Sequence, residues 1–158
     1  MFRAPRPNET PMLLSLAVST GLFVQAEADA LLGGVLSAFH TGSLGERHVV
    51  RVWQRGERLS GWVYFAPDPN SERVWNLWWI GVAPDEQGRG VGSELMAAVE
   101  ADVTATKKTV LVVETSSQPL LEKTRRFYAR RGYSECGRVP DFYGEGDDKV
   151  IFAKRLRR

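Results

Sequence analysis

Three glycines at alternate positions, Gly88, Gly90 and Gly92, follow an apolar run that ends at Val82 and precede an amphipathic segment that begins near Ser93. Glycine adopts backbone conformations that turn successive N–H groups toward one point, and it has no side chain to keep a ligand away. A helix that begins near Ser93 adds N–H groups without helical acceptors and the positive end of its dipole. The loop and the helix together predict a docking site for a diphosphate.

Two other phosphate-binding loops use the same physics. A P-loop requires a lysine after its glycines, and none follows here. The dinucleotide fingerprint has a third glycine where this chain has Ser93, and its glycines turn directly off the strand, whereas Pro84 and its neighbours separate Val82 from Gly88. Too few residues follow Glu114 to complete a doubly wound half of that fold. A glycine-rich turn that binds nothing is the remaining structural alternative.

The periodicity of apolar residues predicts the elements that must hold this loop. The segment 140–148, rich in Pro, Gly and Asp, is expected to be a turn between the last two strands. With one further strand at the start, the order is β-α-α-β-β-β-α-β-α-β-β, which predicts a mixed α/β sheet flanked by helices in a single domain, residues 1–158. Helices are expected at 10–20, about 26–39, 93–106 and 120–131, and strands at 48–54, 59–66, 75–82, 109–114, 133–138 and 149–155.

The segment Val82-x-Pro-x-x-Gln-Gly-Arg-Gly-Val-Gly92 resembles the acyl-CoA loop of the GNAT N-acetyltransferase superfamily. Downstream, Tyr128-x-x-x-Gly132-Tyr133 resembles that superfamily's Tyr-x-x-x-Gly-Phe/Tyr segment. The two motifs stand in the family's order with a predicted strand between them, and the resemblance covers roughly residues 75–155. It implies a GNAT-like fold of about seven strands and four helices, with a CoA-binding core at about 75–133.

The resemblance also implies acetyl-CoA as cosubstrate. In such enzymes the fourth and fifth strands separate, and the pantetheine arm lies between them and bonds to main-chain groups. Arg89 would reach a phosphate, although an exposed loop arginine is as often only solvated. Many family members carry an asparagine where this chain has Thr115-Ser-Ser117, and the Ser117 hydroxyl would replace it. The residues expected to bind the cofactor are Ile80, Val82, Gln87, Gly88, Arg89, Gly90, Val91, Gly92, Ser93 and Ser117.

The implied reaction is direct attack of a neutral amine on the thioester carbonyl. By position, Tyr128 matches the family tyrosine that protonates the departing thiolate; the alternative is a core tyrosine on the apolar face of a helix. Glu114 ends a predicted buried strand, where partial burial favours a general base. In a second interpretation the Glu114 carboxylate is structural and pairs with a helix end or with an arginine such as Arg125. In a third, a chain of waters takes the proton of the amine and there is no dedicated base.

Composition limits the cofactors and partners. The chain is 43% hydrophobic and 25% charged, and its net charge of +2 is too small to indicate nucleic-acid binding. The single cysteine, Cys136, excludes an internal disulfide, and His40 and His48 have no metal-ligand spacing, so no metal is expected. No segment is apolar enough to span a membrane, and we expect a cytoplasmic, bacterial protein. The basic segment 154–158 is interpreted as a solvated tail.

The acceptor is not encoded by any motif. A small-molecule amine, an amino acid and a protein amine are all open, and the segment 20–23 with Tyr64, Trp78 and Tyr143 would border the acceptor groove of a GNAT-like fold. Asp147 and Asp148 are interpreted as a polar turn, with a substrate-ammonium site as the alternative. A non-catalytic acyl-CoA-binding or sensing domain is the second function. The third function is an enzyme that acts on aminoacyl-tRNA, which would need a continuous basic groove to bind the nucleic acid. A homodimer is implied only by the resemblance.

Overall fold

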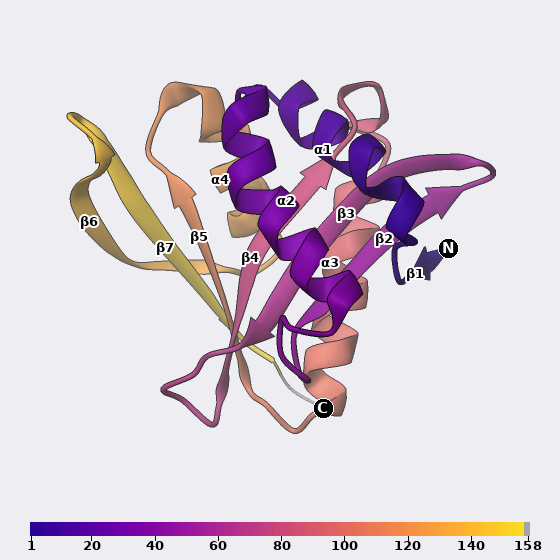
Figure 1. The fold of residues 1–158 in the computed structure, drawn as a ribbon. Coiled ribbons are helices and arrows are strands. Elements are labelled where there is room, and N and C mark those ends of the chain that lie inside the picture. Colours follow the sequence, from indigo (N-terminus) through magenta and orange to yellow (C-terminus); the bar gives the residue numbers. More distant parts are fainter. Residues whose placement is uncertain (157–158) are drawn as a thin grey trace. The chain divides into compact units, whose positions relative to one another are not determined.

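The computed structural model describes residues 1–156, so Arg157 and Arg158 of the predicted basic tail lie outside the described residues. Seven strands form one mixed sheet in the order β1-β2-β3-β4-β5-β7-β6 (Figure 1). The strands are β1 (Phe2–Arg3), β2 (Val49–Arg55), β3 (Arg58–Pro67), β4 (Val74–Val82), β5 (Val110–Ser116), β6 (Ser134–Gly144) and β7 (Asp147–Arg155). The helices are α1 (Thr10–Ser19), α2 (Gln25–Thr41), α3 (Val91–Ala105) and α4 (Glu122–Arg130), with 3₁₀ turns η1 (Pro7–Glu9), η2 (Pro84–Glu86) and η3 (Pro119–Leu121).

The chain divides into two compact units. Unit 1 comprises Met1–Ala66 and Trp79–Ala101, and unit 2 comprises Pro67–Trp78 and the chain from Asp102 onward. The predicted seven strands, four helices and mixed sheet are confirmed. No helix of the described chain is long and apolar enough to cross a membrane.

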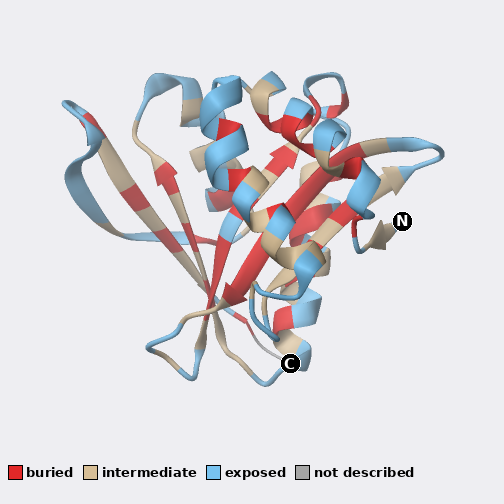
Figure 2. Ribbon diagram, viewed as in Figure 1, coloured by how far each residue is buried: buried red, intermediate tan, exposed pale blue. Residues whose placement is uncertain are grey.

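Unit 1 is built around β3, which is buried from Ser60 to Ala66 (Figure 2). The indole of Trp62 lies fully buried and donates a hydrogen bond from Nε1 to the carbonyl of Leu13 in α1, at 3.1 Å. Gly61 contacts the other elements closely, since a Cβ atom there would lie 2.8 Å from Leu95 of α3 and 2.8 Å from the carbonyl oxygen of Gly81. The core of this unit therefore sets how near α3 and β4 approach β3, and α3 carries the end of the glycine loop.

In unit 2, β5 pairs with β7 antiparallel along seven residue pairs, from Val110↔Arg155 to Ser116↔Lys149. The predicted turn at 140–148 is shorter in the structure, Glu145 and Gly146 only, because β6 continues to Gly144 and β7 begins at Asp147. β6 is the edge strand of the sheet and its register with β7 shifts between Val139 and Gly144, so a proline and a left-handed residue fit there as a bulge. Asp141 is that left-handed residue, with φ 53°.

Two predicted helix starts differ from the structure. The third helix, α3, begins at Val91 rather than near Ser93, because the buried Val91 side chain continues the apolar face of Leu95 and Val99. The fourth is preceded by η3, so α4 begins at Glu122 and the side chain of Leu120 is 65% exposed instead of packing on the apolar face.

Candidate functional site

The glycine loop lies in unit 1 between η2 and α3. Gly88 and Gly90 have φ values of 78° and 85°, in the left-handed region that favours glycine, whereas Gly92 lies within the first turn of α3. A Cβ atom at either left-handed position would meet nothing within 4 Å, so glycine is required here for backbone conformation rather than for packing. The open space on this loop leaves the backbone accessible to a ligand.

The start of α3 supplies hydrogen-bond donors to the same loop. The N–H of Glu94 donates to the carbonyl of Gly90 at 3.0 Å, which is the first bond of the helix. The N–H groups of Val91, Gly92 and Ser93 therefore precede the helical ladder, next to the positive end of the helix dipole. This combination of left-handed glycines and a helix N-terminus is suited to an anion such as a diphosphate.

The base of the loop is held by backbone contacts. The N–H of Ala83 donates to the carbonyl of Ser60 in β3 at 2.9 Å, and the side-chain amide of Gln87 donates to the carbonyl of Val82 at 3.2 Å. Gln87 thus closes the segment between the end of β4 and the glycines. The other predicted loop side chain, Arg89, is exposed.

The predicted main-chain contacts, Ile80 and Val82, lie at the half-buried end of β4. The parallel ladder of β4 with β5 covers Val74 to Leu77 of β4, so both residues lie beyond it. Their polar main-chain groups are therefore outside that ladder.

Tyr128 of α4 lies in unit 2 within an aromatic cluster. Its ring is 3% exposed, and its centroid lies 5.9 Å from that of Tyr133 and 5.8 Å from that of Phe152. Among the described residues the Tyr128 hydroxyl has no hydrogen-bond partner, although a buried tyrosine usually finds one. Burial raises the pKa of the phenol well above its ordinary value, so it stays protonated and able to donate at neutral pH.

Glu114 forms an ion pair that the sequence did not predict. Its Oε2 lies 3.1 Å from Nζ of Lys149 in β7, and both side chains are partly buried. Arg125, the alternative partner, instead donates to the carbonyl oxygens of Ser116 and Gln118, at 2.8 and 2.9 Å. Lys149 was missed because the two residues are brought together only by the β5–β7 register.

Tyr128 and Glu114 lie on opposite faces of the β5–β7 ladder. Val113 pairs with Phe152, whose ring contacts Tyr128, and successive side chains of a strand point to opposite faces. Glu114 therefore faces away from the aromatic cluster. The carboxyl group of Glu114 and the hydroxyl group of Tyr128 therefore do not contact each other.

Ser117 follows β5 and is tied to the start of β7. Its Oγ accepts a hydrogen bond from the N–H of Asp148 at 2.8 Å, and its own N–H donates to the carbonyl of Asp148 at 2.9 Å. Asp147 is buried and hydrogen-bonded to the Ser116 hydroxyl, so this acidic pair belongs to the strand and its ladder rather than to a polar turn. Among the described residues, the Ser117 hydroxyl accepts this hydrogen bond and donates none.

The model of the acetyltransferase (GNAT) family matches residues 21–133, more than two thirds of the chain. The chain belongs to the GNAT acetyltransferase family. A GNAT-family acetyltransferase structure from Desulfovibrio desulfuricans is 30% identical, with 99% of each chain covered and a TM-score of 0.92. No curated protein matches the chain. The predicted family, its fold and the class of enzyme are confirmed.

More distant solved structures share the fold of this GNAT acetyltransferase. The ribosomal-protein-S18-alanine N-acetyltransferase of Escherichia coli is 15% identical and has a TM-score of 0.76, with 100% of this chain and 94% of that chain covered. An aminoglycoside 6'-N-acetyltransferase, solved in complex with coenzyme A, is 14% identical and has a TM-score of 0.77, with 100% and 98% covered.

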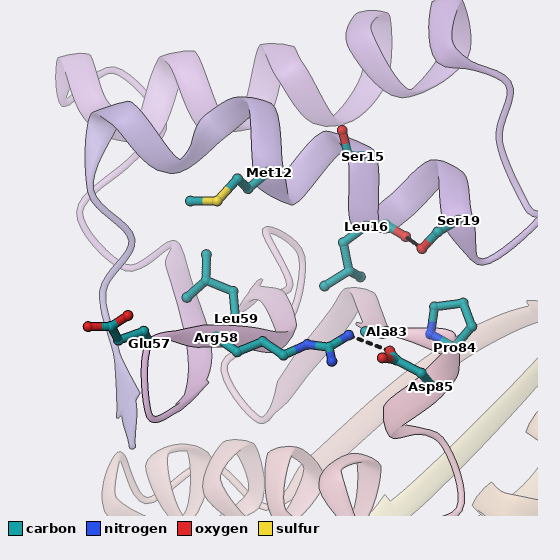
Figure 3. A pocket seen from close by; sticks show the side chains of 10 residues that line it. All are labelled: Met12, Ser15, Leu16, Ser19, Glu57, Arg58, Leu59, Ala83, Pro84 and Asp85. Atoms are coloured by element: carbon teal, nitrogen blue, oxygen red, sulfur yellow. Dashed lines mark hydrogen bonds and ion pairs between the residues drawn. The ribbon is translucent and has the colours of Figure 1, made fainter.

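Unit 1 of this GNAT enzyme also contains a cavity of about 730 Å³, bordered by α1, the β2–β3 hairpin and the start of η2 (Figure 3). None of the residues predicted to bind the cofactor or to transfer protons lines it. Figure 3 shows the Arg58 guanidinium extending along one wall to the carboxylate of Asp85. The lining residues are Met12, Ser15, Leu16, Ser19, Glu57, Arg58, Leu59, Ala83, Pro84 and Asp85.

The acceptor-side candidates of this GNAT enzyme divide into two kinds. Tyr64 is buried and its hydroxyl lies 2.7 Å from Nδ1 of His48, a partner that the sequence did not indicate. Phe23, from the predicted segment 20–23, packs against Trp79 with ring centroids 5.5 Å apart. Trp78 and Tyr143 are about half exposed, at 48% and 49%. The first kind is therefore part of the packing of unit 1, and the second is open to a ligand.

Proposed function

We propose that this GNAT enzyme transfers an acetyl group from acetyl-CoA to a primary amine by direct attack of the neutral amine on the thioester. The observation that carries the proposal is the pair of left-handed glycines, Gly88 and Gly90, immediately before the N-terminus of α3. The motif, the open backbone around it and the family membership support the same ligand, a CoA diphosphate.

Within this proposal the loop N–H groups from Gln87 to Gly92, with Ser93, bind the diphosphate. The main-chain groups of Ile80 and Val82 bond to the pantetheine amides, and Ser117 contacts the cofactor near the thioester. Arg89 is exposed and so free to reach a phosphate. Because most of these contacts are to the backbone, they depend on loop geometry more than on side-chain identity.

Proton transfer is assigned to two groups. The amine attacks the carbonyl carbon, the carbon–sulfur bond breaks, and the departing thiolate takes a proton from the Tyr128 hydroxyl, which is neutral and lacks another partner among the described residues. The attacking amine loses its proton to Glu114 through water, because Glu114 and Tyr128 face opposite sides of the β5–β7 ladder and do not both contact one thioester directly. Glu114 acts beside Lys149, whose Nζ lies 3.1 Å from its carboxylate.

The acceptor is proposed only as a primary amine. The names of the distant neighbours give a ribosomal-protein alanine and an aminoglycoside as the acceptors of those enzymes. For this chain a small-molecule amine, an amino acid and a protein amine stay open. Trp78 and Tyr143 are the exposed aromatic residues that would contact it. The cytoplasmic location and the homodimer stay predictions.

Isothermal titration with acetyl-CoA tests the cofactor part of the proposal. We expect saturable binding with one site per chain. A titration that shows no heat of binding, repeated with free CoA, would overturn the proposal.

Release of free thiol from acetyl-CoA across a library of amines tests the transfer. We expect turnover with at least one class of primary amine and a strong loss of turnover in Tyr128→Phe. Binding of acetyl-CoA without turnover of any amine would favour the alternative, a domain that binds acyl-CoA without catalysis.

A further inference from the structure

Two arginines of the β2–β3 hairpin face the acidic residues that border the glycine loop. Arg58 is hydrogen-bonded to the carboxylate of Asp85, as Figure 3 shows, and its Nη1 lies 3.8 Å from Oε1 of Glu86. Arg55 lies 3.6 Å from Oε2 of Glu86 and 3.8 Å from Oε2 of Glu94. The hairpin thus contacts carboxylates on both sides of the loop, because Glu86 precedes Gln87 and Glu94 lies in the first turn of α3.

Glu86 is the central residue of this group. It is 6% exposed, and its buried Oε2 atom has no hydrogen-bond partner among the described residues. A buried carboxylate is costly unless opposite charge lies near, and here that charge comes from Arg55 and Arg58. The two arginines therefore supply the opposite charge for the buried Glu86 carboxylate, while the backbone N–H of Glu86 donates to the carbonyl of Ala83 at 2.8 Å.

The loop is held at its two ends rather than at its glycines. No atom lies within 4 Å of a Cβ built on Gly88 or Gly90, so the left-handed turns are not packed against neighbouring side chains. Gln87 and Gly90 are bonded to the backbone at the two ends of the loop. Its geometry is therefore set at its ends, where the arginines act.

The arginines also cancel charge that would oppose an anionic ligand. Asp85, Glu86 and Glu94 are three carboxylates around a loop proposed to bind a diphosphate, and like charges repel. The hydrogen bond from Arg58 lowers the pKa of Asp85, so this carboxylate stays charged at neutral pH. Without Arg55 and Arg58 the carboxylates of Glu86 and Glu94 would lose their paired positive charges, and Asp85 would keep only the more distant charge of Arg89.

We propose that Arg55 and Arg58 are positioning residues, which hold the glycine loop in its binding conformation and neutralise the carboxylates that border it. The inference rests on the proposed function of the loop as the CoA diphosphate site. It adds the β2–β3 hairpin to the residues that determine affinity for the cofactor.

The test compares Arg55→Met, Arg58→Met and the double variant with wild type in titrations with CoA. Methionine keeps the apolar stem and removes the charge. We expect roughly threefold weaker binding for each single variant and about tenfold for the double variant. Arg138→Met is the matched control, because Arg138 is 47% exposed, against 49% and 51% for Arg55 and Arg58, and pairs with Glu135 in unit 2. It should bind CoA as wild type does.

A rescue separates positioning from general damage. In the double variant Glu86 has lost both opposite charges, so adding Glu86→Gln should recover most of the lost affinity. Amide hydrogen exchange at residues 88–93 without ligand should be faster in the double variant and return toward wild type in the triple variant, with the melting temperatures reported alongside.

Three results would overturn the inference: CoA binding by the double variant as tight as that of wild type, an equal loss in Arg138→Met, or no rescue by Glu86→Gln. If wild type binds no CoA, the proposed function fails. In that case the hydrogen-exchange comparison alone tests whether the arginines hold the loop, and unchanged exchange at residues 88–93 in the double variant would reject that inference.

Discussion

The carboxylate of Glu114 and the ammonium group of Lys149 form an ion pair across the β5–β7 ladder, 3.1 Å apart and partly shielded from solvent. Lys149 also lies 3.6 Å from the centroid of the Phe142 ring, so its charge is shared between a carboxylate and an aromatic face. This relationship leaves two roles for Glu114, proton acceptor in catalysis or partner in a structural ion pair. The two roles predict different behaviour of the same two variants.

If Glu114 accepts the proton of the amine, Glu114→Gln lowers kcat about a hundredfold, because a positioned base contributes on that scale. Lys149→Met should then change kcat by at most a few fold, since the carboxylate remains. Steady-state kinetics with acetyl-CoA and a turned-over amine measures both, with Glu135→Gln as a control carboxylate in unit 2. A purely structural pair would show as similar, small losses of stability in both variants, about 1 kcal/mol or less, with kcat kept.

Tyr128→Phe removes one hydroxyl and keeps the aromatic contacts with Tyr133 and Phe152. We expect kcat to fall about a hundredfold or more with little change in the KM for acetyl-CoA, because the hydroxyl is proposed to protonate the departing thiolate. The free energy of unfolding should stay within about 1 kcal/mol, since the hydroxyl has no hydrogen-bond partner among the described residues. Equal kcat values for the variant and wild type would assign Tyr128 to packing alone.

Stability at alkaline pH should depend on Tyr128. Burial raises the pKa of its phenol in the folded chain, whereas in the unfolded chain the phenol ionises near a pKa of about 10. The folded state therefore binds the phenol proton more tightly than the unfolded state does. The contribution of the protonated Tyr128 to the free energy of unfolding is fully present below pH ~10 and is lost as the pH rises further. Denaturant unfolding between pH 8 and 11 should show a falling free energy, by up to about 1.4 kcal/mol per pH unit for one tyrosine, and a shallower fall in Tyr128→Phe. Parallel curves for the two proteins would contradict the prediction.

Variants of Gly90 test whether backbone conformation or charge has the larger effect on the affinity of the loop for CoA. Gly90→Ala places a side chain at φ 85° in open space, so its cost is conformational, about 1 kcal/mol. Gly90→Asp adds a negative charge beside the proposed diphosphate, and we expect CoA affinity to fall at least tenfold below that of the alanine variant. Gly42, with φ 76° and nothing within 4 Å of a built Cβ, supplies matched control variants in unit 1. Equal affinities of Gly90→Asp and Gly42→Asp would show that the loop does not face the ligand.

Local features of this chain could be predicted from the sequence because their causes are local. Helical and strand periodicity predicted the elements of both units, and the glycine spacing predicted the left-handed turns at Gly88 and Gly90. The same reasoning failed at 140–144, where turn-forming residues lie in a bulged edge strand. There the pairing with β7 outweighed local preference, because an edge strand tolerates residues that an inner strand excludes.

The family, the order of the elements and the loop proposed to bind the cofactor could therefore be predicted from residue types and their spacing, because backbone conformation depends on neighbouring residues. Which charged groups pair could be seen only in the folded chain, where Lys149 lies beside Glu114, and Arg55 and Arg58 lie beside Glu86. These partners are far apart along the chain, and strand register and hairpin position bring them together. Coulomb interaction depends on distance in space, which the spacing of residues along a chain does not specify.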